Sequence, residues 1–309
     1  MSIQSFSLII LLLAINSSFG QMHHRTCDSS LYLIPTQVQS EYNQQNYLKA
    51  AKAAGCFWER CSEENIKNEL VYITVYNTAC CWSLLNEKDS AFKQLNYVIK
   101  DDLFLPLFRE MQSDDDFLNL HTDERWHDLI KKGDSLFGDF SKSIDSGLVR
   151  ILEKIRYNDQ KYRSEVVQLN QQKADESTIK KVWRNATIQD SVDMIKIEEI
   201  IEKYGWPGPR LVGFDGNKTV FLVVQHAPLK VQLKYLPVMK KAVQDNLASS
   251  GDLAFLVDRV RLRQKKKQLY GTQLNSDFSK AFPIQDSGTV DCRRFKVGLV
   301  TLDRYIHNW

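Results

Sequence analysis

The fold is decided by residues 75–99, which read VYNTACCWSLLNEKDSAFKQLNYVI. Apolar and small residues recur at helical spacing over residues 75–85, and the polar residues 86–89 interrupt the pattern before it resumes over residues 91–99. Two amphipathic helices joined by a short turn are therefore predicted. Similar spacing continues through most of the chain, so we expect a mainly α-helical fold.

The helix pair resembles a tetratricopeptide repeat, because small residues at Ala79 and Ala91 and the bulky Trp82 stand where two such helices cross closely. Residues 47–58 resemble the second helix of an earlier, degenerate repeat, and the segment from Asp114 to Trp126 resembles the tail that closes such arrays. The resemblance implies a groove for a protein or peptide partner. Two repeats that only pack on a neighbouring domain are the alternative.

The start of the chain is typical of an export signal. The apolar run over residues 8–15 is too short to cross a bilayer, and Ser18-Phe19-Gly20 supplies small residues for cleavage. Because residues 1–7 contain no Lys or Arg, an uncleaved anchor is the alternative. We expect a periplasmic or secreted protein with no transmembrane segment after cleavage.

Four regions are predicted, and the second helical domain is expected to contain at most short strands, near Leu269 to Leu274. The regions are a signal peptide (1–20), a flexible start (21–37), tetratricopeptide-like helical hairpins (38–140) and a C-terminal helical domain (141–309). The net charge of +3 argues against a nucleic-acid partner.

The cysteines leave two interpretations open. In an oxidising compartment Cys56 or Cys61 could form a disulfide with Cys80 or Cys81. Small buried thiols in a helical core are the alternative. The cysteine spacing fits no zinc site and no Cys-x-x-Cys motif. No His-x-x-x-His pair occurs, and the adjacent His23 and His24 lie in the expected flexible start, so no metal or cofactor is predicted.

The tetrapeptide Gly133-Asp134-Ser135-Leu136 has the letters of a lipase and esterase nucleophile motif. A reactive serine of that kind lies on a turn between a strand and a helix, whereas residues 128–132 read as the basic end of a helix. Asp303 and His307 have one residue too many between them for that family. An ordinary interdomain turn is the better interpretation.

Short polar motifs crowd the C-terminal half of the chain, and their order there is characteristic. They are Asp159-Gln160-x-x-Arg163, Tyr204-Gly205-Trp206-Pro207-Gly208, Gln225-His226-Ala227, Asp258-Arg259, Gln268-x-Tyr270-Gly271-Thr272-Gln273 and Arg293-Arg294-x-x-x-Gly298-Leu299. This series resembles a bacterial family of uncharacterised domains over roughly residues 145–309. The resemblance implies a domain boundary but no activity.

These motifs supply the candidate site residues, because polar side chains among apolar helices must be paired when they are buried. One hypothesis is a binding or interaction module for an anionic envelope ligand. Its binding residues are Gln225, Arg259, Tyr270, Gln273, Arg294, Asp159, Arg163 and Trp206.

The alternative is an envelope-associated hydrolase or transferase. In that case His226 is the general base and Asp258 orients it or acts as a second acid. Arg259, Arg294 and Gln273 would hold the substrate. For His226 a buried histidine that is hydrogen-bonded to backbone is a third interpretation, and Trp206 can equally be a core residue.

Overall fold

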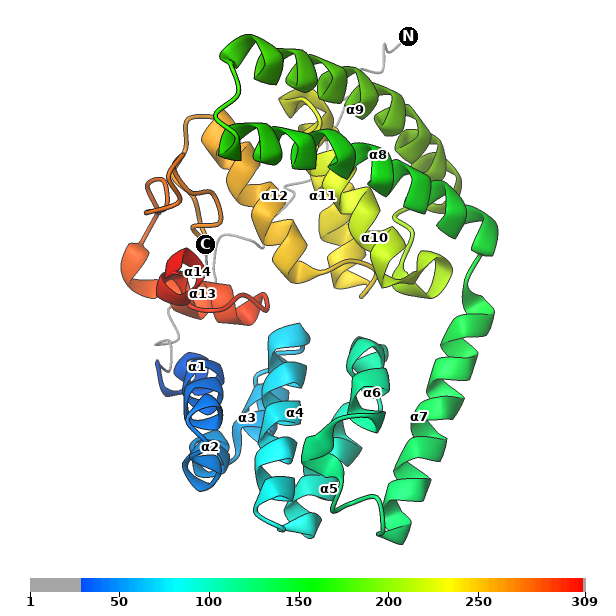
Figure 1. Ribbon diagram of the computed structural model, residues 1–309, viewed down its shortest axis with the longest axis vertical. Helices are drawn as coiled ribbons and strands as arrows, with labels where there is room; N and C mark the ends of the chain where they lie inside the picture. The colour runs from blue at the N-terminus through cyan, green and yellow to red at the C-terminus, as the bar shows by residue number, and fades with distance from the viewer. Residues whose placement is uncertain (1–28, 308–309) are drawn as a thin grey trace, which may run out of the picture.

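The computed structural model describes residues 29–307, and this part of the chain is mainly α-helical, as expected (Figure 1). No strand occurs within these residues. Where short strands were expected, only two isolated bridges form, Gln268 with Ile284 and Leu274 with Ala281. The predicted signal peptide and the first part of the predicted flexible start (21–37) lie outside the described range, whereas residues 29–37 of that start belong to a helix.

The first seven helices share one hydrophobic core and are called the first unit here. They are α1 (Ser29–Asn43), α2 (Tyr47–Ala54), α3 (Phe57–Glu63), α4 (Glu69–Leu84), α5 (Lys88–Val98), α6 (Leu105–Gln112) and α7 (Glu124–Ser143). Two short 3₁₀ helices, η1 (Asp102–Phe104) and η2 (Asp115–Phe117), flank α6. In Figure 1 the first unit forms the lower half of the molecule.

The predicted helix pair is present as α4 and α5. The Asn68 side chain caps α4 by accepting from the Val71 backbone N–H, and the turn after α4 is made by Asn86 with a φ of +60°. Ala79 and Ala91 are fully buried. The small side chains therefore let the two helices pack closely, as the spacing predicted.

The segment over residues 47–58 is not the single helix that was expected. Gly55 has a φ of +46°, a conformation that glycine adopts without steric cost, and α2 ends before it. A new helix, α3, begins at Phe57. The backbone preference of one glycine thus overrides a continuous apolar pattern.

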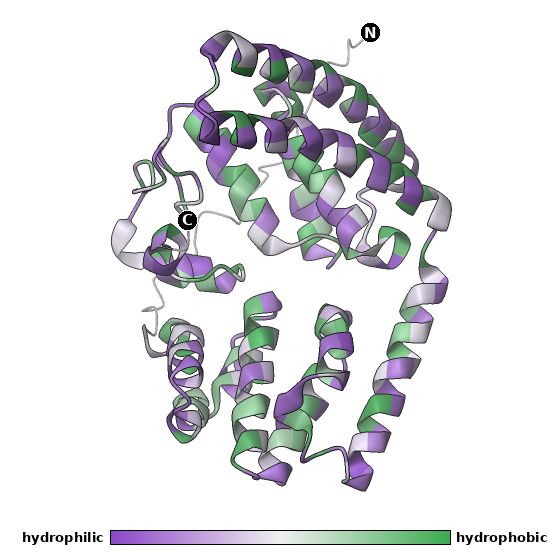
Figure 2. Cartoon of the chain, in the orientation of Figure 1, coloured by the Kyte–Doolittle hydropathy of each residue, from purple (hydrophilic) through white to green (hydrophobic). Residues whose placement is uncertain are grey.

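The next five helices share a second core and are called the second unit. They are α8 (Ser146–Gln171), α9 (Glu176–Tyr204), α10 (Pro209–His226), α11 (Leu229–Gln244) and α12 (Ser250–Arg263). Helices α8 and α9 form a long antiparallel hairpin at the top of Figure 1. Figure 2 shows hydrophilic and hydrophobic residues mixed along both, as expected for helices with one face in solvent.

The polar residues 164–190 are helical except for a short turn at residues 172–175. Asp175 caps α9 by accepting from the Thr178 backbone N–H. Gly205, with a φ of +70°, ends α9. Helix α10 has a kink at Gly213, whose φ is +71°.

A closing segment returns from the second unit to the first. It contains η3 (Ser287–Thr289), α13 (Val290–Lys296) and α14 (Leu302–His307), and Figure 1 shows α13 and α14 between α1 and α12. Phe295 is buried in the first core, with its ring centroid 6.0 Å from that of Phe57. The predicted domain boundary near residue 140 stays a prediction, because α7 ends near it while α13 packs across it.

Two sequence questions are answered by the fold. Ser135 is an exposed residue inside α7, so it lacks the strand-to-helix turn of a nucleophile, and Gly133 before it faces the ring of Phe108. None of the helices in residues 29–307 combines the length and apolar character needed to cross a bilayer.

Candidate functional site

A buried polar network joins three helices of the second unit. From α8 come Asp159 and Arg163, from α9 comes Asp190, and from the last turn of α10 comes His226. The His226 Nδ1 atom lies 2.8 Å from Asp159 Oδ1. Arg163 makes contacts of 3.0 to 3.2 Å with both carboxylate oxygens of Asp190, and its Nη1 atom is 3.2 Å from Asp159 Oδ1. Helical spacing of four places Asp159 and Arg163 on the same face of α8.

Asp159 is buried, with 2% of its side chain exposed. Burial alone would raise its pKa, but the hydrogen bond from His226 and the charges of His226 and Arg163 outweigh burial, and the pKa is lowered. Gln160 donates a further hydrogen bond of 2.6 Å to Asp159 Oδ2. Asp159 is therefore held as a carboxylate.

An ionised Asp159 fixes the orientation of the His226 ring. The Nδ1–H group donates to the carboxylate, and in the neutral form of the ring Nε2 is then the nitrogen with the free lone pair. No described group hydrogen-bonds Nε2, and 15% of the His226 side chain is exposed. Such a histidine can accept a hydrogen bond from a ligand or remove a proton from it.

Arg259, from α12, lies close to this network. Burial lowers its pKa, and the charges of Arg263 and Arg163 lower it further. Its Nε atom is buried without a hydrogen-bond partner, and no carboxylate in residues 29–307 forms an ion pair with it. Arg263 donates from Nη1 to the Ala227 carbonyl at 2.8 Å, so the region between α8 and α12 carries three guanidinium groups.

Asp258 has a different environment from the one expected. It is fully buried and accepts hydrogen bonds from the backbone N–H groups of Leu269, Tyr270 and Thr272 and from the Thr272 hydroxyl, at 2.7 to 3.2 Å. The carboxylate that contacts His226 is Asp159. Asp258 therefore organises the loop that follows α12.

Arg294 organises the same loop from the other side. It is fully buried, and it donates to the carbonyls of Val300 at 2.6 Å and Tyr270 at 2.7 Å. Burial lowers its pKa to about 10, and its guanidinium lies 4.8 Å from the centre of the Tyr305 ring. Through these contacts Arg294 connects α13 to the loop after α12.

The remaining candidates contribute mainly to packing. Gln273 donates its backbone N–H to Gln268 Oε1 at 2.8 Å, and its side chain contacts the Thr272 hydroxyl at 3.2 Å. Trp206 is buried in the second core, and its indole N–H has no partner among the described residues. Tyr270 is half-buried, and burial raises its pKa.

Gln225 is buried next to His226 in the sequence. Its backbone carbonyl accepts from Gln232 Nε2 at 2.6 Å, while its own Oε1 atom has no hydrogen-bond partner in the described chain. The structure thus brings Asp159, Arg163 and His226 into one hydrogen-bonded network. Asp258, Gln273 and Arg294 belong to the loop after α12.

Two functional candidates were missed in the sequence. Asp190 holds Arg163 in place, and Asp193 is fully buried one turn later on α9, with burial raising its pKa. Asp193 accepts from Gln189 Nε2 at 3.0 Å, while its Oδ2 atom is unpartnered within the described range. The sequence feature that could have indicated them is the spacing of three between two aspartates in a long polar helix.

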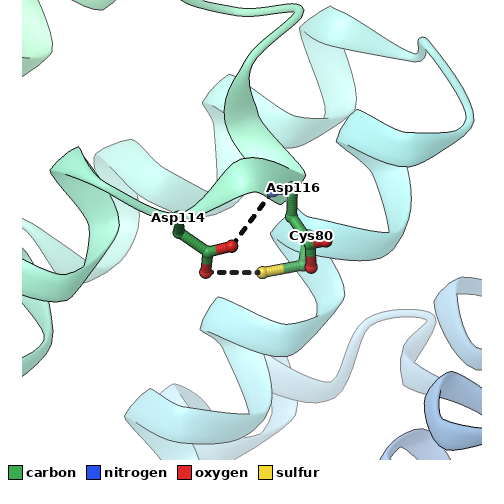
Figure 3. A group of neighbouring side chains, drawn as sticks. All are labelled: Cys80, Asp114 and Asp116. Carbon is green, nitrogen blue, oxygen red and sulfur yellow. Dashed lines mark hydrogen bonds between the residues drawn. The ribbon is translucent and has the colours of Figure 1, made fainter.

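A separate cluster in the first unit has the residue types of a metal site. Cys80, Asp114 and Asp116 offer ligand atoms within 4.8 Å of one another (Figure 3). Tyr76 donates to Asp114 at 2.6 Å and Tyr42 to Asp116 at 2.5 Å, and burial raises the pKa of both tyrosines and of the Cys80 thiol. Protonated donors facing the carboxylates fit a structural hydrogen-bonded cluster that ties η2 to α1 and α4.

The cysteine bridge considered between the early helices does not form. Cys56, Cys61, Cys80 and Cys81 are free thiols, and the last three are buried. Burial raises the pKa of Cys61 and Cys81 to about 12. Cys292 is disulfide-bonded, and Cys27 lies outside the described residues. The alternative interpretation, small buried thiols in a helical core, holds for Cys61, Cys80 and Cys81 but not for the exposed Cys56.

Comparison with known families gives the chain its place. The model of a family of unknown function (DUF6624) matches residues 148–308, more than half of the chain. The chain therefore belongs to this family, and the expected C-terminal domain of unknown function is confirmed. No curated protein and no solved structure matches the chain.

Proposed function

We propose that the protein is an exported binding module whose C-terminal domain binds a polar ligand at His226. The observation that carries this proposal is the His226 ring, which Asp159 holds with the unoccupied lone pair of Nε2 on a partly exposed site. A network that served packing alone would have no need to direct a hydrogen-bond acceptor at a solvent-accessible position.

The proposed location is the periplasm or the extracellular space. The apolar run over residues 8–15 supports export, and the disulfide at Cys292 supports an oxidising compartment. Helices α4 and α5, with the small residues Ala79 and Ala91 at their contact, support a tetratricopeptide-like first unit that offers a surface to a protein or peptide partner.

The test is a thermal melting screen of the full chain with envelope glycans, peptides and phosphorylated metabolites. We expect at least one compound to raise the melting temperature of the wild type by several degrees, and His226→Gln to lose that rise. His307→Gln, the same change at an exposed histidine, is the matched control and should respond like the wild type. An equal response of wild type and His226→Gln would show that the ligand does not contact this site.

A second candidate is an envelope-associated hydrolase or transferase. The Asp159–His226 hydrogen bond favours it, because an aspartate that orients a histidine through Nδ1 prepares Nε2 to act as a general base. Incubation of each stabilising compound with the wild type, followed by NMR, should then show product. Product formation that persists in His226→Gln would contradict this role.

A further inference from the structure

Arg259 is a half-buried cation for which the described chain supplies no anion. Its Nε atom is buried and unpartnered, and its neighbours in charge are two other guanidinium groups, those of Arg163 and Arg263. A charge removed from water is unfavourable unless an opposite charge or several hydrogen bonds replace the lost hydration. Arg259 is therefore a half-buried guanidinium group whose negatively charged partner is not supplied by the described chain.

The neighbouring arginines do not share this property. Arg163 is engaged by Asp190 and Asp159, and Arg263 donates to the Ala227 carbonyl. Of the three arginines, only Arg259 has neither a carboxylate nor a carbonyl partner among the described residues. One oxyanion would supply that partner.

We propose that Arg259 anchors an oxyanion of the bound ligand, either a carboxylate or a phosphate group. The planar guanidinium presents its N–H donors in a fork that matches both groups, and either group would supply the opposite charge that Arg259 lacks. The inference rests on the proposed binding function and adds the chemical class of the ligand. The charges of Arg259 and Arg163 interact, so a ligand anchored on Arg259 would lie near the network that contains His226.

The proposal accounts for a half-buried arginine at this position despite the cost of burying its charge. A structural arginine is satisfied by carbonyls or carboxylates, as Arg293 and Arg294 are. Replacing such a residue lowers stability. An arginine that is paired only when a ligand is bound is an unfavourable buried charge in the ligand-free protein. Its replacement should leave the ligand-free protein as stable as before or more stable.

The experiment compares melting of the full chain in sodium chloride, sodium phosphate and sodium succinate at equal ionic strength. We expect phosphate or succinate to raise the melting temperature of the wild type by several degrees, and Arg259→Met to lose this rise while melting at or above the wild type in chloride. Arg184→Met, at an exposed arginine of α9, is the matched control and should keep the rise. A response to phosphate alone indicates a phosphorylated ligand, and a response to succinate alone indicates a carboxylate.

Two results would overturn the proposal: no response of the wild type to either anion, or an equal response of Arg259→Met. If that variant does not fold, Arg259→Lys replaces it, because lysine keeps the charge without the fork and should give less than half of the rise. His226→Gln, melted in the same buffers, separates the two proposals. If the anions still raise the melting temperature of His226→Gln but not that of Arg259→Met, Arg259 is the anchor and His226 has no role in binding. If a ligand from the screen depends on His226 but neither anion raises the melting temperature of the wild type, His226 binds the ligand and Arg259 is not its anchor.

Discussion

Asp159 is the residue on which the candidate site depends. It is buried, it contacts both His226 and Arg163, and its pKa is lowered by these partners against the effect of burial. A carboxyl group with a lowered pKa in the folded state stabilises the protein above its unfolded pKa of about 4, and the contribution is lost as the pH falls through the folded value. The stability of the protein should therefore report on this site.

We predict that Asp159→Asn lowers the free energy of unfolding by about 3 kcal/mol at pH 6, because the change leaves Arg163 and His226 without their buried partner. The difference from the wild type should be smaller at pH 3, because the unfolded wild type then binds a proton at Asp159 that the folded protein takes up only at a lower pH. Urea unfolding at both values measures this.

The control is Asp215→Asn, which changes an aspartate with 89% of its side chain exposed and should cost less than about 0.5 kcal/mol at either pH. A loss for Asp159→Asn that is equal at pH 6 and pH 3 would show that the ionised form of Asp159 is not what stabilises the fold.

For single residues, the sequence predicted which side chains belong to the candidate site better than it predicted which of them contact one another. Asp159, Arg163 and His226 all belong to its motifs, but Asp159 and His226 are 67 residues apart, and residue type alone did not distinguish Asp159 from Asp258 as the carboxylate beside the histidine. The difference arises from packing: the α8–α9 hairpin presents Asp159 to the end of α10, while Asp258 faces the loop after α12.

Helix α10 shows how one backbone angle positions a site. Its first turns, from Pro209, are separated from its last turns by Gly213, whose φ of +71° is outside the helical region. The second part of the helix carries Gln225 and His226 at its end. A Cβ atom added to Gly213 would meet no atom within 4 Å, so any cost of a larger residue comes from the backbone alone.

We predict that Gly213→Ala lowers the free energy of unfolding by about 1–2 kcal/mol, because an L side chain disfavours the left-handed region. Gly138→Ala is the matched control with the opposite sign. Gly138 lies inside α7 with equally open space, so alanine there should raise stability by about 0.5–1 kcal/mol.

Guanidinium unfolding of both variants provides the measurement. Equal effects of the two substitutions would mean that the kink at Gly213 is not fixed in the folded state.

The kink was not predictable from the sequence, because glycine at that position is compatible with a helix, a turn or a close contact. The ends of the neighbouring helices were better specified, by Gly205 and Asp175.

In the whole molecule, the two units meet around a cavity of about 750 Å³. Its walls include the start of α4, the start of α12 and the ion pair between Arg210 and Asp102, whose atoms approach to 2.6 Å. Asn68 contributes most directly to the connection, because its side chain both caps α4 and donates to the Phe295 carbonyl at 2.9 Å.

We predict that Asn68→Ala lowers the free energy of unfolding by about 2–3 kcal/mol, the sum of a lost helix cap and a lost buried hydrogen bond. Asn68→Ser keeps the cap but cannot reach Phe295, so it should cost only about 1 kcal/mol. Thermal or chemical unfolding distinguishes the two.

Equal losses for the alanine and serine variants would show that the contact between the units contributes nothing to stability.

The helical class and the family domain were predictable from periodicity and motifs. The return of α13 to the first core was not, because Phe295 follows a polar segment and nothing in its neighbourhood indicates a partner 227 residues earlier, at Asn68.

The position of Phe295 also bears on how the chain folds during synthesis. Helices α1 to α6 leave the ribosome long before residue 295 exists, so Phe57 and its neighbours spend that interval with part of their apolar surface uncovered. Contacts between distant residues form late and slowly. The first core is therefore complete only after α13 has been synthesised and has packed against it.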